Sequence, residues 1–367
     1  MSEYNWQKPD WTVFRYELSG LEGDLSRYVE RTGRLDGLTT AMPGDLRMDT
    51  VISLMVEEAV KTSEIEGVSF SRADVQSSVR KNLGLAHDPA LLRHRPAAAG
   101  IGELMAAVRR MFAEPLTEDM LFDWHRMVMD GSRGVHVGAW RTHAEPMQVV
   151  SGAMGKEKVH FEAPPSVRVA EEMLRFVDWF NGDSTTLVAP VRAAIAHLWF
   201  ESIHPFEDGN GRIGRALAEK SLSQSAGRPV ILSLSEAIEA KKSSYYGALM
   251  SAQRTNDISP WIRYFLETLL DAQHRAEALI LFTLRKVAFY DRFRNGLNER
   301  QLKVVARMLD EGPRGFEGGM NARKYMGLTK ASKATATRDM NHLLELGVFE
   351  RLGDAGGRST AYGLRLD

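Results

Sequence analysis

A histidine, two acidic residues, two arginines and several glycines lie within one short segment of this chain. The segment spans residues 204–215 and reads HPFEDGNGRIGR. Its histidine, His204, can take a proton from a hydroxyl near neutral pH. The carboxylate of Asp208 is the hard oxygen ligand that Mg²⁺ prefers when nucleotide phosphates carry the ion. This combination of residue types favours chemistry on a nucleotide phosphate.

The glycines and arginines of the same segment suit an anion-binding turn. Gly209 and Gly211 flank Asn210 and allow backbone N–H groups to approach an anion closely. If a helix begins after Gly209, its first amides point at the same anion, and Arg212 and Arg215 share one helix face. Each guanidinium can bind phosphate oxygens through two hydrogen bonds.

Other interpretations fit this segment less well. Its glycines match a dinucleotide-binding fingerprint, but residues 190–202 before them show helical rather than strand periodicity. A calcium loop starting at Asp208 would need glycine at its sixth position, which Ile213 occupies. No phosphate-binding G-x-x-x-x-G-K-[ST] string occurs in the chain. A capped turn between two helices explains any one of these residues, but not all of them together.

Residues 204–215 resemble the H-P-F-x-[D/E]-G-N-G-R-x-x-R signature of the Fic family, with every signature position filled. The resemblance implies a mainly α-helical fold, with a Fic-type bundle and a β-hairpin flap. It implies transfer of AMP from ATP to a Ser, Thr or Tyr hydroxyl of a protein, including the enzyme itself. His204 would be the general base, Asp208 would hold Mg²⁺ on the phosphates, and Phe206 would anchor the loop. The residues that it assigns to nucleotide binding at this segment are Gly209, Asn210, Gly211, Arg212 and Arg215.

A second pattern lies upstream, in the sequence KTSEIEGVSFS. Residues 48–60 before it have apolar positions at helical spacing, and Gly67 suits the end of that helix. Glu66 is therefore expected near a helix C-terminus, where a carboxylate is unfavourable unless a cation faces it. Thr62, Glu66 and Gly67 match the family's inhibitory pattern [S/T]-x-x-x-E-[G/N]. The resemblance implies that Glu66 pairs with Arg215 and that the protein inhibits itself; alone, the pattern also fits an ordinary surface glutamate.

Residues 138–165 lose the helical period and place apolar residues on both sides of a glycine-rich turn, which predicts a β-hairpin. This hairpin resembles the family's flap, which is implied to lie over the active site and to bind the target peptide as an added strand. The residues assigned to the flap are Val149, Val150, Ser151 and Gly152. Further along, Tyr245, Tyr246 and Gln253 occupy positions where family members contact adenine and ribose. Packing in the core is an equally good interpretation of the two tyrosines.

Composition limits the other classes of function. The chain has 367 residues, 47 basic and 48 acidic, so no global charge favours nucleic acid or a membrane surface. It contains no cysteine, which excludes a thiol nucleophile and a zinc–thiolate site. The beginning of the sequence has no export signal, and no apolar run approaches membrane-spanning length. These features favour a cytoplasmic protein without a membrane partner.

The pattern along the chain predicts four parts. They are a helical extension with the inhibitory motif (1–112), a catalytic domain (113–270), a linker helix (271–295) and a C-terminal domain (296–367). The last part reads as three helices followed by two glycine-bounded strands, which predicts a winged helix. Lys330, Lys333 and Arg338 on or near the third of these helices, with Arg358 in the wing, would face DNA phosphates, but such a domain also docks proteins.

Two alternatives to AMP transfer remain open from the sequence. The first is hydrolytic removal of AMP in the same site, with Glu66 positioning water. The second is a winged-helix DNA-binding regulator whose nucleotide site only senses ATP. A homodimer is a further possible assembly.

Overall fold

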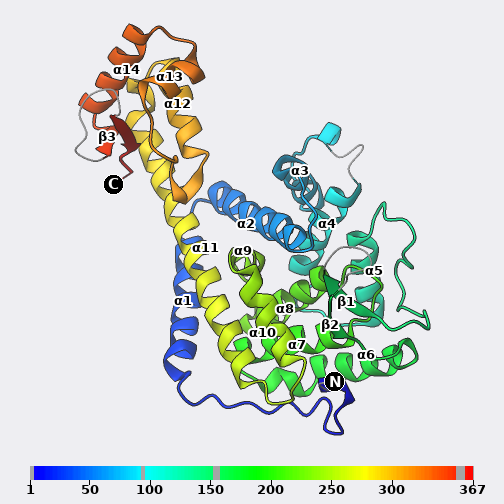
Figure 1. Cartoon of the computed structure of the whole chain (residues 1–367). Helices are drawn as coiled ribbons and strands as arrows, with labels where there is room; N and C mark the ends of the chain where they lie inside the picture. Colours follow the sequence, from blue (N-terminus) through cyan, green and yellow to red (C-terminus); the bar gives the residue numbers. More distant parts are fainter. Residues whose placement is uncertain (1–3, 92–95, 152–157, 353–359, 367) are drawn as a thin grey trace. The chain divides into compact units, whose positions relative to one another are not determined.

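The computed structural model describes residues 4–91, 96–151, 158–352 and 360–366, and the chain forms two compact units. One unit comprises residues 1–37 and 51–276, and the other comprises residues 38–50 and 277–367. Most residues are helical, as predicted, and the strands form two short antiparallel hairpins (Figure 1). Three helices begin in one unit and end in the other: α1 (Glu22–Thr40), α2 (Gly44–Ile65) and α11 (Ser259–Phe293).

The first unit surrounds α7 (Ala189–Ile203), a helix that is buried over all but its first residue. Every α7 residue from Pro190 to Ile203 is buried. A helix that is apolar nearly all round belongs in the interior. The other elements of this unit are α3 (Arg72–Asn82), α4 (Pro96–Arg110), α5 (Glu118–Val128), α6 (Ser166–Asn181), α8 (Asn210–Ala226), α9 (Leu234–Ala240), α10 (Lys242–Ala252), β1 (Gln148–Ser151), β2 (Lys158–Glu162) and the short 3₁₀ turns η1 (Asn5–Gln7), η2 (Pro89–Leu91) and η3 (Asp183–Thr186).

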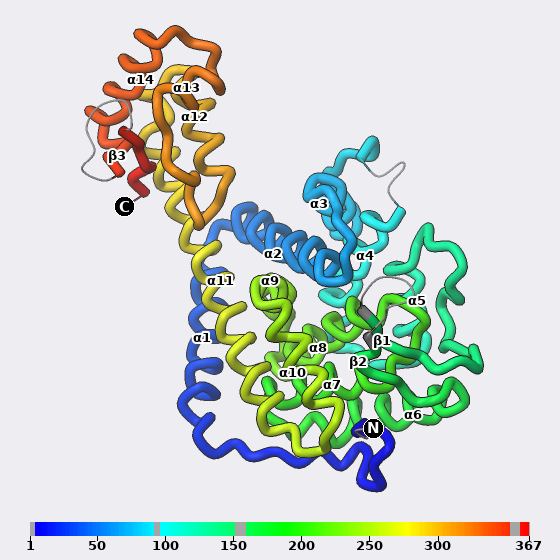
Figure 2. The backbone as a smooth tube through the Cα atoms, in the orientation of Figure 1, coloured from blue at the N-terminus to red at the C-terminus, as the bar shows by residue number. Residues whose placement is uncertain are grey.

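The N-terminal segment packs against the β1–β2 hairpin and α6 (Figure 2). Trp6 donates its indole N–H to the Glu162 carbonyl at 2.7 Å, and its ring lies under the Arg168 guanidinium. The Tyr4 ring meets Phe161 edge to face at 5.0 Å. These contacts support β2 from outside the hairpin.

The second unit has its own apolar core, which includes Val304, Val305, Met308 and Leu343. Its elements are η4 (Arg294–Gly296), α12 (Glu299–Leu309), η5 (Gly312–Arg314), α13 (Ala322–Thr329), α14 (Lys333–Glu345), β3 (Phe349–Leu352) and β4 (Ala361–Leu364). Three helices and a hairpin follow one another in the predicted order. Assignment to the winged-helix class stays a prediction, and Arg358 lies outside the described residues.

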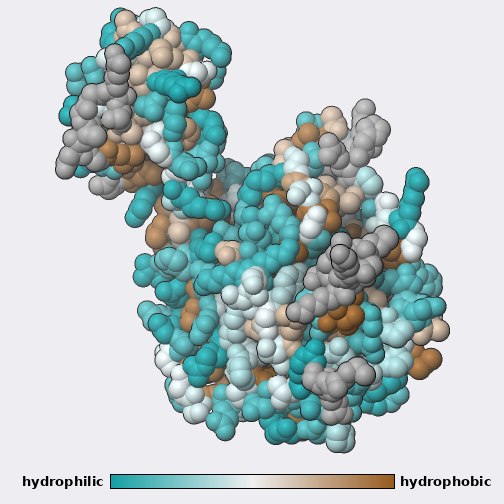
Figure 3. All heavy atoms as spheres, in the orientation of Figure 1, coloured by the Kyte–Doolittle hydropathy of each residue, from teal (hydrophilic) through white to brown (hydrophobic). Residues whose placement is uncertain are grey.

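The linker region differs from the prediction. Helix α11 begins at Ser259 rather than near Asp271, because Trp261, Phe265 and Leu269 continue its buried face toward the N-terminus. The division between the two compact units falls within this helix, after Ala276. No helix in the described ranges is long and apolar enough to cross a membrane. The visible surface of each unit is mainly hydrophilic, with scattered apolar residues (Figure 3).

Candidate active site

The predicted catalytic segment connects two packed helices, α7 and α8. His204 follows α7 in the left-handed conformation, with φ 50° and ψ 61°, and its N–H donates to the Phe200 carbonyl at 2.9 Å. Gly209 also has positive φ, at 81°, and α8 starts at the next residue. The positive φ values of His204 and Gly209 mark the two ends of a short loop between the helices. This loop begins at His204 and leads directly into the first backbone amides of α8. The helix predicted after Gly209 is therefore present.

The side chain of Asn210 stabilises this loop by hydrogen bonds to the backbone of Phe206. Its side chain accepts a hydrogen bond from the Phe206 N–H at 2.9 Å and donates to the Phe206 carbonyl at 2.8 Å. Phe206 is fully buried and stacks on His125 with a centroid distance of 4.0 Å. Asn210 was predicted to bind phosphate, but its amide group is used in the loop. What it retains for an anion is its backbone N–H at the start of α8.

Arg141 is a buried support of this loop that the sequence did not reveal. Its guanidinium donates to the carbonyls of Pro164, Ile203 and His204 and to the Ser166 hydroxyl, at 2.6 to 3.2 Å. Only 1% of the residue is exposed. The partners come from the start of the catalytic loop and from the segment that leads into α6, so Arg141 fixes the backbone that carries the histidine. Its own neighbourhood contains no motif that would have identified it.

Asp208 is the most open of the charged residues in the segment. Its side chain is 60% exposed, and Oδ1 accepts from the Gly209 N–H at 2.6 Å and lies 3.6 Å from Arg212 Nη2. Among the described residues no group of three or more His, Asp or Glu side chains could hold a metal ion. A single exposed carboxylate fits Mg²⁺ that arrives with nucleotide phosphates, since this ion is commonly bound through one or two carboxylates and substrate oxygens.

The predicted partner of Arg215 is in place. Arg215, which is 1% exposed, donates from Nε to Thr62 Oγ1 at 2.7 Å and from Nη2 to the Thr62 carbonyl at 2.9 Å. Nη2 also lies 2.6 Å from Glu66 Oε1, and 29% of the Glu66 side chain is exposed. Gly67, at φ 80°, follows the end of α2. Thr62, Glu66 and Arg215 are therefore brought together as expected.

The Glu66 carboxylate also lies against the first turn of α8. A Cβ atom at Gly211 would collide with Glu66 Oε1 and approach Arg215 Nη1. Glycine at this position thus permits the carboxylate to reach the helix N-terminus, where backbone amides attract anions. Glu66 holds the place in which the sequence predicted phosphate oxygens.

Burial and nearby charges determine the protonation of these groups. Burial acts to raise the pKa of Glu66, but the charge and hydrogen bond of Arg215, together with the Arg212 charge, outweigh it and lower the pKa. Burial, with the Arg141 charge, lowers the pKa of His204 to about 4. Burial, with the Glu66 charge, raises the pKa of Glu201 to about 8, and its Oε2 lies 3.8 Å from His204 Nδ1. At neutral pH His204 is neutral and can accept a proton.

The residues predicted to bind adenosine lie largely inside the protein. Tyr245 is 2% exposed and shares a 2.8 Å hydrogen bond with His197, and Gln253 is 4% exposed and donates to the Glu201 carbonyl. The packing interpretation given for the tyrosines therefore describes Tyr245, and Gln253 is buried as well; contact of these residues with adenosine stays a prediction. Tyr246 is partly exposed, and its hydroxyl donates to the Ile65 carbonyl at 3.3 Å.

The predicted hairpin is formed by β1 and β2. Val149 pairs with Phe161 and Val150 with Val159, with a register shift between the two valines. Ser151 ends β1 opposite Lys158, and Gly152 lies outside the described residues. Val150 is 47% exposed, so its apolar side chain is available for contact.

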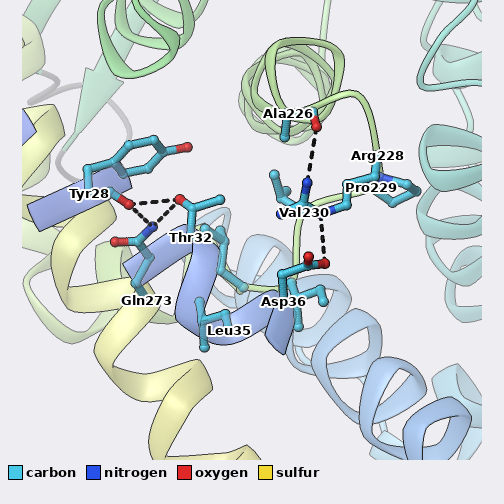
Figure 4. A pocket seen from close by; sticks show the side chains of 11 residues that line it. Tyr28, Thr32, Leu35, Asp36, Ala226, Arg228, Pro229, Val230 and Gln273 are labelled. Carbon is cyan, nitrogen blue, oxygen red and sulfur yellow. Dashed lines mark hydrogen bonds and ion pairs between the residues drawn. The ribbon is translucent and has the colours of Figure 1, made fainter. Parts of the chain in front are cut away.

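A cavity between α1, α11 and the segment after α8 is too small for a nucleotide. It measures about 20 Å³ and lies beside Thr32, Asp36, Arg228 and Gln273 (Figure 4). Gln273 donates to the Tyr28 carbonyl and to Thr32, and Arg228 pairs with Asp36 at 2.8 Å. This volume corresponds to roughly one water molecule.

Comparison with known proteins decides the family of the central region. Residues 115–222 match the model of the Fic/DOC family, and residues 4–85 match a domain of unknown function, DUF4172. The chain carries a Fic domain. This domain contains the segment 204–215, α7 and most of α8, whereas Thr62 and Glu66 fall in the DUF4172 region.

The relatives of the Fic domain are named protein adenylyltransferases. One from Caenorhabditis elegans is 34% identical over 152 residues, which cover 41% of this chain and 27% of the relative. Another from Nematostella vectensis is 25% identical over 235 residues, which cover 62% of this chain and 50% of the relative. This chain thus spans between about a quarter and a half of the length of these curated relatives.

Solved structures support the same fold. A Fic family protein from Desulfovibrio desulfuricans is 20% identical, with a TM-score of 0.51 over 93% of this chain and 96% of that protein. Residues 134–508 of Fic-1 from C. elegans are 23% identical, with a TM-score of 0.51 over 69% of this chain and 71% of that chain. The Fic fold therefore holds the site described above.

Proposed function

We propose that this protein transfers AMP from ATP to a hydroxyl of a protein, itself included, and that Glu66 holds it in an inhibited state. The relatives' names support the reaction class. The observation that carries inhibition is the position of the Glu66 carboxylate, which lies on Arg215 and against Gly211 at the start of α8. A carboxylate there excludes a phosphate group by charge and by volume.

The reaction uses the neutral imidazole of His204 as general base. The imidazole takes the proton from the target hydroxyl, and the hydroxyl oxygen bonds to the α-phosphorus of ATP. The bond from that phosphorus to the oxygen that bridges to the β-phosphate breaks, and pyrophosphate leaves with the bonding electrons. The amides of Asn210 and Gly211 and the guanidiniums of Arg212 and Arg215 stabilise the phosphate charge, whereas the Gly209 amide donates to Asp208. Asp208 would hold Mg²⁺, which when bound neutralises phosphate charge.

The flap and the C-terminal unit have separate proposed roles. The exposed Val150 on β1 suits contact with an extended target segment that adds to the hairpin. The C-terminal unit, with its three helices and hairpin, suits a winged helix that binds DNA or another protein through Lys330, Lys333 and Arg338.

Removal of AMP by hydrolysis is the second candidate. The Glu66 carboxylate is held within the site and is partly open to solvent, so it could orient a water toward a bound AMP–protein bond. Transfer and removal would then share one set of phosphate-binding residues.

Labelled ATP separates these candidates. Parent, Glu66→Gly and Glu66→Gly/His204→Ala proteins are incubated with Mg²⁺ and ATP labelled at the α- or γ-phosphate, and protein-bound label is measured. AMP transfer predicts label only from the α-position, strongest in Glu66→Gly and lost in the double variant. Label from the γ-position would indicate kinase chemistry instead. If no label appears, loss of AMP from a previously modified target tests hydrolysis.

A further inference from the structure

The inhibitory helix α2 carries a second buried carboxylate, Glu58, that the family pattern does not include. Glu58 is 4% exposed. Ser233 Oγ and the Ser235 N–H each donate to its Oε2 at 2.8 Å, and Ser235 Oγ donates to Oε1. Both serines belong to the N-terminal end of α9, where Ser233 is the N-cap. One carboxylate therefore fastens α2 to α9 through three hydrogen bonds.

Glu58 shares a helix face with the residues that meet Arg215. Thr62 and Glu66 follow it at successive intervals of four positions, which is close to one helical turn each. A shift of α2 by one residue would move these groups by about 1.5 Å along the axis and rotate them away. The 2.6 Å contact between Glu66 and Arg215 does not survive such a shift. Any group that fixes α2 along its axis therefore also fixes the inhibitory contact.

Helix α10 holds the C-terminal end of α2. Lys242 Nζ donates to the Glu64 carbonyl and the Tyr246 hydroxyl donates to the Ile65 carbonyl, each at 3.3 Å. The last carbonyls of a helix lack partners within it; Tyr246 donates to that of Ile65, and Lys242 adds to the Gly67 N–H at that of Glu64. We call Ser233, Ser235, Lys242 and Tyr246 the α9–α10 clamp.

We propose that the α9–α10 clamp, acting mainly through Glu58, holds α2 at the position where Glu66 meets Arg215, so that Glu58 is a positioning residue for inhibition. This inference rests on the proposed inhibition by Glu66. The strength of the contact follows from burial: loss of the Glu58 carboxyl would leave three buried donors of Ser233 and Ser235 without their acceptor, which costs more than an exposed hydrogen bond. Release of α2 then requires either loss of the Glu58 bonds or a ligand that draws α9 or α10 away.

The test compares Glu58→Ala with a neighbouring control. Glu57→Ala removes a carboxylate from the same helix whose side chain is 14% exposed and which pairs with Arg72 of α3 rather than with α9. Ser235→Ala is a milder variant that leaves Glu58 and its bonds to Ser233 and the Ser235 N–H in place. Self-labelling from α-labelled ATP and amide hydrogen exchange over residues 55–66 are measured on each full-length protein, and thermal unfolding confirms that it is folded.

We expect Glu58→Ala to increase self-labelling by roughly tenfold, the effect of losing about 1.4 kcal/mol from the inhibited state. Exchange over residues 55–66 should accelerate, Ser235→Ala should change both quantities in the same direction, and Glu57→Ala should change neither. Glu58→Ala/Glu66→Gly should label no more than Glu66→Gly, because both changes act on one contact. If Glu58→Ala does not fold, Ser235→Ala decides the same comparison.

Two results would overturn the proposal. One is parental labelling in a folded Glu58→Ala protein while Glu66→Gly is active, even if α2 exchanges faster. The other is unchanged exchange over residues 55–66. If Glu66→Gly gives no label at all, the proposed reaction fails, and the exchange measurement by itself still decides whether Glu58 anchors α2.

Discussion

Glu66 Oε1 accepts a hydrogen bond from Arg215 Nη2 at 2.6 Å, although 149 positions separate the two residues in the chain. The same guanidinium donates to the side chain and the carbonyl of Thr62. Nε and Nη2 of Arg215 are thus used by one face of α2, and a nucleotide phosphate must displace the Glu66 carboxylate to bind Nη2. This competition is the physical basis of the predictions on inhibition.

Thr62→Val should weaken inhibition without abolishing it. Valine keeps the shape of threonine but removes the oxygen that accepts from Arg215 Nε, which leaves a buried donor unpaired at a cost of about 1–3 kcal/mol. We expect self-labelling to rise severalfold and to stay below that of Glu66→Gly. Thr62→Ser, which retains the hydroxyl, is the control. Equal labelling in Thr62→Val and the parent would show that this hydrogen bond does not contribute.

His204→Ala, made in the active Glu66→Gly background, should lower the rate of AMP transfer by roughly 10²–10⁴, the usual contribution of a general base. ATP binding should change little, since the phosphate contacts proposed for Arg212, Arg215 and the α8 amides remain. Calorimetry of ATP binding, together with the rate of labelling, separates the two effects. Turnover retained in the variant would remove His204 from the mechanism.

Asn210 offers a test of loop closure against phosphate binding. Asn210→Ala removes both hydrogen bonds to the Phe206 backbone, so the free energy of unfolding should fall by about 1–3 kcal/mol. Asn210→Asp keeps the acceptor for the Phe206 N–H but places a negative charge at the start of α8. It should weaken ATP binding more than Asn210→Ala does. Denaturant unfolding and ATP titration measure the two quantities, and the reverse order of ATP affinities would contradict this account.

Arg141→Met should destabilise the protein and slow transfer without touching substrate. The change leaves the carbonyls of Pro164, Ile203 and His204 without a buried donor, and we expect the free energy of unfolding to fall by about 3 kcal/mol or more. Arg175→Met is the matched control, because that arginine is 49% exposed and pairs with Glu171, which is 66% exposed. The unfolding midpoint of Arg141→Met should lie clearly below that of the control variant. Similar midpoints would show that Arg141 does not stabilise the loop.

The pH dependence of the AMP transfer rate should show the low pKa that burial gives His204. Because the pKa of His204 is lowered to about 4, the imidazole stays neutral down to about that pH, and the rate falls only as the pH drops through this value. Glu66 acts to raise this pKa, so the Glu66→Gly variant should not move the acid limb upward. We expect no acid limb near pH 6.5 in Glu66→Gly, where an exposed histidine would titrate.

The same measurement on Glu66→Gly/Arg141→Met provides an internal check. The Arg141 charge helps to lower the pKa of His204, so its removal should move the acid limb toward higher pH. Circular dichroism at each pH shows whether the protein is still folded. An acid limb near pH 6.5 in Glu66→Gly itself would mean that His204 is exposed once Glu66 is absent.

The sequence by itself determined the parts of the site that are local in the chain. His204, Asp208, Gly209 and the α8 amides depend on one loop and the helix that follows it, and the spacing of residue types in that segment predicts both. The Glu66–Arg215 contact was also expected, but only through resemblance to a family. Neither residue's own neighbourhood contains information about the other.

The tertiary structure decided which polar side chains form hydrogen bonds inside the protein and are therefore not available to a ligand. In the folded chain the Asn210 side chain bonds the Phe206 backbone, and Tyr245 and Gln253 lie in the interior. Arg141 and Glu58 are buried and hold neighbouring segments through hydrogen bonds. Burial lowers the pKa of His204, and that burial depends on elements far apart in the chain. A polar residue's role depends on which donor or acceptor faces it, and for these residues the partner is supplied by chain folding over long separations.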